Sequence, residues 1–193
     1  MAVTAPEPEA PEVAAHNIAV GTRLWAGATT FAFLCPFFAY LYLRSLNTAD
    51  LWRPAGIDPP RALGVAIVAL TVASAVVLLL TSRAPLQQRN APLLLVSLSL
   101  ALGLAAVALQ VVEYTRLGFG PTDGGYASVF VAWTGLSALF ALGTILWLET
   151  FLASMLRGGA QVVLGPRLAA LAFYWAYLTG LSAVMWFCLY VVV

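Results

Sequence analysis

The sequence predicts an all-α integral membrane protein, built as a bundle of five transmembrane helices. Hydrophobic residues make up 62% of the 193 residues and charged residues only 9%, whereas a soluble domain carries about a quarter charged residues. Five stretches are also long enough to cross a bilayer, which takes about 20 mainly apolar residues. Because backbone groups cannot stay unpaired in lipid, these stretches should be helices.

The apolar stretches fix the domain organisation. We expect spans at about residues 24–43, 62–80, 92–114, 126–152 and 168–193. Pro36 should kink the first span, and Pro92 stands in the first turn of the third, where proline is favoured. Residues 1–20 are rich in Ala, Pro and Glu and lack a periodic apolar pattern. We predict that they form a disordered cytoplasmic tail, which leaves residues 21–193 as the transmembrane domain.

The arginines predict the orientation of the spans. If the amino terminus is cytoplasmic, five arginines lie inside and four outside, which is the direction that the positive-inside rule favours. The inside set is Arg23, Arg83, Arg89, Arg157 and Arg167, and the outside set is Arg44, Arg53, Arg61 and Arg116. We therefore predict that the amino terminus is cytoplasmic and the carboxy terminus outside. A formal net charge of +1 gives no sign of a nucleic-acid partner.

Small and polar residues follow one face of the third span. Ser99, Gly103, Ala106, Gln110 and Glu113 recur at steps of four, three, four and three residues, which places them on one side of a helix. Membrane helices pack through small residues, with polar side chains as added attraction. Packing alone explains the first three residues of this stripe, whereas Gln110 and Glu113 require polar partners.

Glu113 and Glu149 are the two carboxylates in or beside apolar runs, and such residues are functional candidates by default. Glu113 lies near the outer end of its span. Arg116 follows one turn later and is the nearest candidate for an ion pair, and Arg44 and Arg61 stand at the outer ends of the first two spans. Two alternatives stay open for Glu113, an ion pair with one of these arginines or contact with interfacial water. Glu149 is expected to reach the cytoplasmic interface.

The sequence offers few ligands for a metal or a cofactor. A haem or copper centre in a membrane takes several histidines from spanning helices, and the single histidine, His16, lies in the predicted tail. Cys35 and Cys188 lie in apolar runs without metal-ligand spacing, so we expect them to be small buried side chains. No catalytic, cofactor-binding or metal-binding residue is predicted, and we expect no cofactor to be bound by this chain.

Six short motifs, taken in order along the chain, resemble those of a known family. They are AYLYLR at 39–44, ADLWRP at 49–54, LTVASAV at 70–76, QVVEY at 110–114, GGYASVFVAWTG at 124–135 and FYWAYLTG at 173–180. Together they resemble subunit III of the haem–copper cytochrome c oxidases. Gln110, Glu113 and Tyr114 match the family's Q-x-x-E-Y, and the five spans resemble its shorter bacterial form.

The chain departs from that family at several polar positions. The family's Glu in its first shared helix falls near Thr29 or Thr30, neither of which is acidic. Ser137 and Phe140 stand in place of two histidines, and Thr179 stands where an Asp is expected. These polar residues of the family are absent here, so the resemblance does not imply their roles in proton supply or lipid anchoring for this chain. A supporting role through packing is unaffected.

The resemblance implies a non-catalytic subunit of a respiratory terminal oxidase in the bacterial plasma membrane. That complex reduces oxygen with electrons from cytochrome c, or alternatively from quinol, and pumps protons in aerobic respiration. Haem and copper are then expected in the partner subunits I and II, and this chain would support subunit I and contact membrane lipids. Two alternatives are a small transporter or channel, with Glu113 and Glu149 on an ion path, and a scaffold subunit of another membrane complex.

Overall fold

The computed structural model describes residues 10–47, 52–53, 56–83, 90–157 and 161–192. This part of the chain contains five helices and no strand. The helices are α1 (Pro11–Ser45), α2 (Arg61–Arg83), α3 (Asn90–Arg116), α4 (Gly125–Leu156) and α5 (Gln161–Tyr190). All five are long and apolar enough to cross a membrane, so the predicted fold class and number of spans agree with the structure.

The first helix is longer than the sequence predicts. It begins at Pro11, so the predicted disordered tail is wrong for residues 11–20, and residues 1–9 lie outside the described part. Pro11 supplies a first-turn proline, and Glu12 places a negative charge in the same turn. Both features favour a helix start, and they allow the helix to begin well before the apolar stretch itself.

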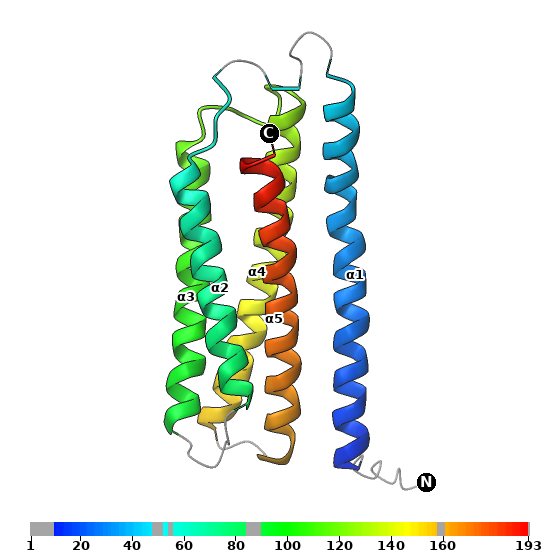
Figure 1. The fold of residues 1–193 in the computed structure, drawn as a ribbon. Helices are drawn as coiled ribbons and strands as arrows, with labels where there is room; N and C mark the ends of the chain where they lie inside the picture. The colour runs from blue at the N-terminus through cyan, green and yellow to red at the C-terminus, as the bar shows by residue number, and fades with distance from the viewer. Residues whose placement is uncertain (1–9, 48–51, 54–55, 84–89, 158–160, 193) are drawn as a thin grey trace, which may run out of the picture.

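Four of the helices form a closed ring. α2 packs against α3 and α5, and α4 packs against the same two helices. We call α2–α5 the four-helix ring. α1 lies outside it and packs against α4 and α5 but against neither α2 nor α3 within the described residues, and it stands beside the other four in Figure 1. α4 and α5 are therefore the most enclosed helices, with 44% and 50% of their spanning windows buried against 22% for α1.

The two termini lie at opposite ends of the bundle (Figure 1). We call the end that holds the carboxy terminus the C-terminal end. There α1 and α3 finish, α2 and α4 begin, and α5 finishes. Side chains at this end therefore come from all five helices and from the connection between α1 and α2 that carries Trp52 and Arg53.

The predicted stripe on α3 faces the inside of the ring. Ser99, Gly103, Ala106, Gln110 and Glu113 are all buried, which confirms that this side of the helix is a packing seam. At Gly103 the ring of Trp175 on α5 lies close to the backbone, 3.4 Å from where a Cβ would stand. The small residues thus bring α3 close to its neighbours and place Gln110 and Glu113 in the interior.

Candidate functional site

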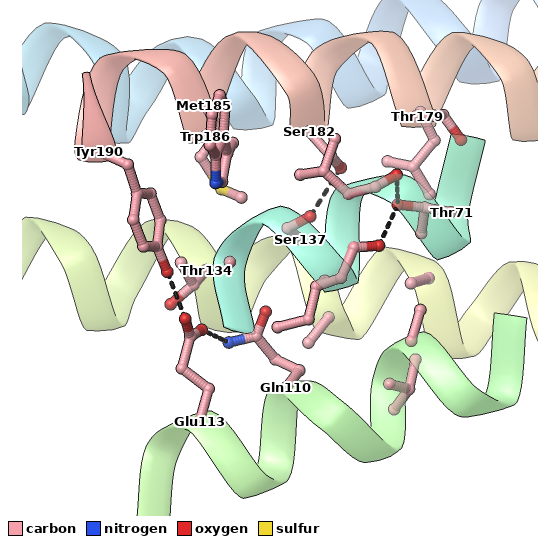
Figure 2. A pocket seen from close by; sticks show the side chains of 18 of the residues that line it. Thr71, Gln110, Glu113, Thr134, Ser137, Thr179, Ser182, Met185, Trp186 and Tyr190 are labelled. Carbon is pink, nitrogen blue, oxygen red and sulfur yellow. Dashed lines mark hydrogen bonds between the residues drawn. The ribbon is translucent and has the colours of Figure 1, made fainter. Parts of the chain in front are cut away.

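Glu113 is a buried carboxyl that joins two helices on opposite sides of the ring. Its side chain is 1% exposed. Oε1 accepts a hydrogen bond from the Tyr190 hydroxyl at 2.5 Å, and Oε2 accepts one from Nε2 of Gln110 at 2.6 Å (Figure 2). Gln110 lies one turn earlier on α3, whereas Tyr190 ends α5. Because the backbones of α3 and α5 do not come close to each other, the carboxyl bridges the ring interior.

Neither predicted environment for Glu113 is correct. The single ion pair in the described part of the chain joins Arg53 to Asp58, so no arginine there pairs with Glu113. The 1% exposed fraction also contradicts contact with interfacial water. An arginine would have to leave water to reach this carboxyl, and that desolvation can exceed the gain of an ion pair. Neutral donors avoid this cost, and the ring interior supplies two.

The three proposed arginine partners lie elsewhere. Arg116 and Arg61 are exposed at the C-terminal end, and Arg44 donates a hydrogen bond to the Tyr40 hydroxyl at 2.9 Å. Long arginine side chains near helix ends extend their charged groups toward the interface. Glu149 is likewise exposed on α4, near the opposite end of the bundle from Glu113, and the structure does not bring the two carboxylates together.

Tyr114 points to a different helix from Gln110 and Glu113. Its hydroxyl lies 2.8 Å from Oγ1 of Thr134 on α4. The Thr134 hydroxyl already donates to the carbonyl of Phe130, so Tyr114 is the donor in this pair. The Q-x-x-E-Y motif therefore makes two connections, one across the ring to α5 and one to the neighbouring helix α4.

Tyrosine hydroxyls from α1 and α4 hold the end of α5 and the residues directly after it. The Tyr40 hydroxyl donates to the carbonyl of Val192 at 3.1 Å, and the Tyr126 hydroxyl donates to the carbonyl of Leu189 at 2.7 Å. The last carbonyls of a helix have no partner within the helix, and in a membrane each one needs a partner in the protein. Together with the Glu113–Tyr190 bond, these contacts form what we call the C-terminal clamp.

The remaining helix, α2, contributes a glycine to the clamp. A Cβ added to Gly64 would lie 2.7 Å from the ring of Tyr190 and 2.9 Å from Nε1 of Trp186. Only glycine leaves room for these rings, so Gly64 sets the position from which Tyr190 reaches Glu113. The sequence predicted Glu113 and Tyr114 as site residues but not Gly64, Tyr40, Tyr126 or Tyr190. The available signal was a tyrosine in an apolar run, whose hydroxyl needs a partner when it is buried.

A second polar junction lies at the middle of the ring. Oγ of Ser74 on α2 donates to the carbonyl of Ser99 on α3 at 2.7 Å, and Oγ of Ser99 donates to the carbonyl of Ser74 at 2.9 Å. Trp175 on α5 adds a third helix, because its Nε1 donates to Oγ of Ser74 at 2.9 Å. These buried groups satisfy one another, so the junction is a structural connection.

The connection between α1 and α5 uses neutral hydroxyl groups. The Thr29 hydroxyl lies 2.9 Å from that of Tyr174, and Thr30 forms a hydrogen bond with Tyr177. Both threonines also donate to carbonyls one turn earlier on α1, so the tyrosines are the donors across the seam. This seam contains the positions at which the resemblance leads us to look for an acidic residue.

The described residues include no group of three or more His, Cys, Asp or Glu side chains arranged to hold a metal ion. His16 and Cys35 are exposed, and Cys188 is partly buried. Around Glu113 the side chains are an amide, hydroxyls and aromatic rings. Such a set can hold helices in register and bind polar molecules.

The family comparison covers nearly the whole chain. The family described as cytochrome c oxidase subunit III matches residues 10–193. The chain belongs to this family. The family resemblance found in the sequence is therefore confirmed, and together with the five apolar helices it indicates a multi-pass membrane protein.

Curated members of the family are similar to this chain along most of its length. The cytochrome c oxidase subunit 3 of Tachyglossus aculeatus aculeatus is 29% identical over 186 residues, which are 93% of this chain and 70% of that protein. The protein of the same name from Struthio camelus is 28% identical over 176 residues, 88% of this chain and 66% of the relative. A third, from Candida parapsilosis, is 34% identical over 136 residues, 64% and 51% of the two chains. The matched region spans about two thirds of the first two relatives.

Proposed function

We propose that this chain is the third subunit of a haem–copper terminal oxidase of the cytochrome c oxidase type, located in a bacterial plasma membrane. The observation that carries the proposal is the match of the subunit III family to residues 10–193. A pattern that extends through all five helices is far more specific than any one motif. In this role the chain is a non-catalytic component of an oxidoreductase that belongs to the respiratory electron transport chain.

The proposed role is to support the haem-bearing subunit I while it reduces oxygen and pumps protons. Haem and copper would be held by partner subunits I and II. The hydrogen bonds in the ring interior support this assignment, because they join the chain's own helices to one another. Large apolar side chains are exposed on the outside of the bundle, for instance Phe31 at 73% and Leu94 at 71%, and suit contact with lipid or with an apolar protein surface.

The proposed orientation places the amino terminus in the cytoplasm and the C-terminal clamp on the outer side. The bias of five inside arginines over four supports this direction. Reporter proteins fused after Arg89 and after Arg157 should both report the cytoplasm. A periplasmic signal from both fusions would reverse the orientation.

Purification through this chain tests the proposed function directly. The affinity tag belongs at the amino terminus, because residues 189–192 are held by Tyr40, Tyr126 and Glu113. The detergent-solubilised particle should show haem absorbance, contain subunits I and II by mass spectrometry and consume oxygen. The same preparation from an untagged strain is the control. A stable haem-free particle with unrelated partners would contradict the proposal.

A further inference from the structure

A cavity of about 50 Å³, partly open to the surroundings, lies between the helices of the four-helix ring. All four ring helices contribute to its wall. Glu113 and Gln110 lie along one side, and Thr71, Ser137 and Ser182 bring hydroxyl groups from the other helices (Figure 2). A cavity needs about 10–15 Å³ to hold one water molecule. The space therefore suits a few molecules of that size.

The wall presents acceptor oxygens that the protein leaves partly unused. Thr71 and Thr179 each donate to a carbonyl one turn earlier on their own helix, at 2.7 and 2.8 Å. A hydroxyl that donates in this way keeps its lone pairs available. The Glu113 oxygens accept one hydrogen bond each from the protein, and each can accept another. The cavity can therefore receive several further hydrogen bonds.

Trp186 supplies a donor without a partner in the same wall. Its Nε1 is buried and has no hydrogen-bond partner among the described residues. Nε1 of an indole can only donate, and an unpaired buried donor costs about 1–3 kcal/mol. A ligand that accepts from Trp186 and donates to nearby oxygens would satisfy both sides at once.

Water has this combination of donors and acceptors. A bound cation fits the wall less well, because hard cations take six or more oxygen ligands, usually with several carboxylates, and Glu113 is the one carboxylate in the wall. We propose that the cavity is a water-binding site, in which a small cluster is held between the Trp186 N–H, the Glu113 carboxyl and the hydroxyls. The cluster hydrates Glu113 from inside the bundle and extends toward its middle.

Radiolytic hydroxyl-radical labelling of the purified assembly tests for this water. A millisecond X-ray pulse produces radicals from water, so a buried side chain is oxidised where water is bound beside it. The chain offers one matched pair. Met185 lines the cavity and Met155 does not, although they are 6% and 7% exposed. Trp186 lines it and Trp133 does not, and Nε1 of both is buried without a partner. The Trp186 side chain is partly exposed and that of Trp133 is buried, so the methionines decide the test.

We expect Met185 and Trp186 to be oxidised several-fold faster than Met155 and Trp133. In water labelled with oxygen-18, the added oxygen should carry the label. Equal slow oxidation of Met185 and Met155 would show that the cavity is dry and would overturn the proposal.

A cavity-filling variant gives an independent check. Ala138 lines the cavity, and Ala138→Leu should lower oxidation of Met185 and Trp186 to the level of Met155 and Trp133. Ala132→Leu is the matched control, because Ala132 is on the same helix but is exposed, and it should leave the oxidation unchanged. Full oxidation of Met185 in an assembled Ala138→Leu protein would contradict the site. If this variant does not assemble, the comparison within the unmodified protein decides.

Discussion

Two of the polar junctions that end on α5 differ in chemistry. Inside the ring, Glu113 accepts hydrogen bonds from Tyr190 and Gln110. Outside the ring, α1 meets α5 through the threonine–tyrosine pairs of Thr29 and Thr30. The first junction depends on a carboxyl group that serves two donors, whereas the second pairs neutral hydroxyls one to one.

The difference shows how the chain distributes its polar groups. The Glu113 carboxyl connects α3 to α5 across the ring, because one oxygen accepts from Tyr190 on α5 while the other accepts from Gln110 on α3 itself. Helices in direct contact need only single hydroxyl pairs. Loss of the Glu113 carboxyl leaves two buried donors without an acceptor, whereas loss of one hydroxyl of a pair affects a single hydrogen bond, so the ring junction should be the more sensitive of the two to substitution.

Removing the carboxyl altogether should have the largest effect. Glu113→Ala leaves the donors of Tyr190 and Gln110 without their acceptor, and each unpaired donor costs about 1–3 kcal/mol. We expect the subunit to leave the purified assembly at a clearly lower temperature, as measured by native electrophoresis after heating. Glu149→Ala is the control, because Glu149 is exposed. Equal behaviour of the two variants would show that the buried carboxyl does not stabilise the subunit.

Crowding the ring junction should have the next largest effect. Gly64→Val places atoms within 3 Å of the Tyr190 ring, and overpacking of this kind costs about 1–3 kcal/mol. The same heating assay should show earlier release of the subunit. Gly27→Val is the matched control, because nothing lies within 4 Å of a Cβ at Gly27. A Gly64→Val protein as stable as this control would refute the close approach of α2 and α5.

A milder change at Glu113 separates support from proton transfer. Glu113→Gln keeps the shape and one acceptor oxygen but replaces the other oxygen with a donor. We expect weaker retention of the subunit and nearly normal oxygen turnover per haem in complexes that have assembled. Subunit stoichiometry and turnover should be measured on the same sample. Normal stoichiometry with collapsed initial turnover would show that Glu113 serves proton transfer.

Changes at the outer junction should have the smallest effect. Thr29→Val and Tyr174→Phe each remove one side of a neutral pair, and a hydrogen bond of this kind contributes about 0.5–1.5 kcal/mol. The loss of stability in the double variant should not exceed the sum of the losses in the two single variants. A double-mutant cycle in the heating assay isolates the contribution of the pair. A loss equal to that of Glu113→Ala would remove the distinction between the two junctions.

The sequence by itself determined the features that follow from local composition. Apolar length predicted the five spans, and spacing placed Gln110 and Glu113 on the buried side of α3. Both predictions depend on one helix at a time, because hydropathy and the helical repeat are properties of adjacent residues. The family resemblance was equally readable, since its motifs are short and stand in order. The helical start at Pro11 was missed because the pattern sought was apolar, and a polar helix extension lacks it.

The tertiary structure alone decided which groups meet inside the bundle. Tyr190 lies 77 positions from Glu113, and no pattern within either helix connects them. Arg116, Arg44 and Arg61 stand at helix ends near the predicted level of Glu113, but none of them pairs with it. The tyrosine reaches the carboxyl because α5 lies across the ring from α3 and Gly64 leaves room for its ring. Which side chains form hydrogen bonds inside the bundle depends on how whole helices pack. That packing depends on all the contacts between the helices together.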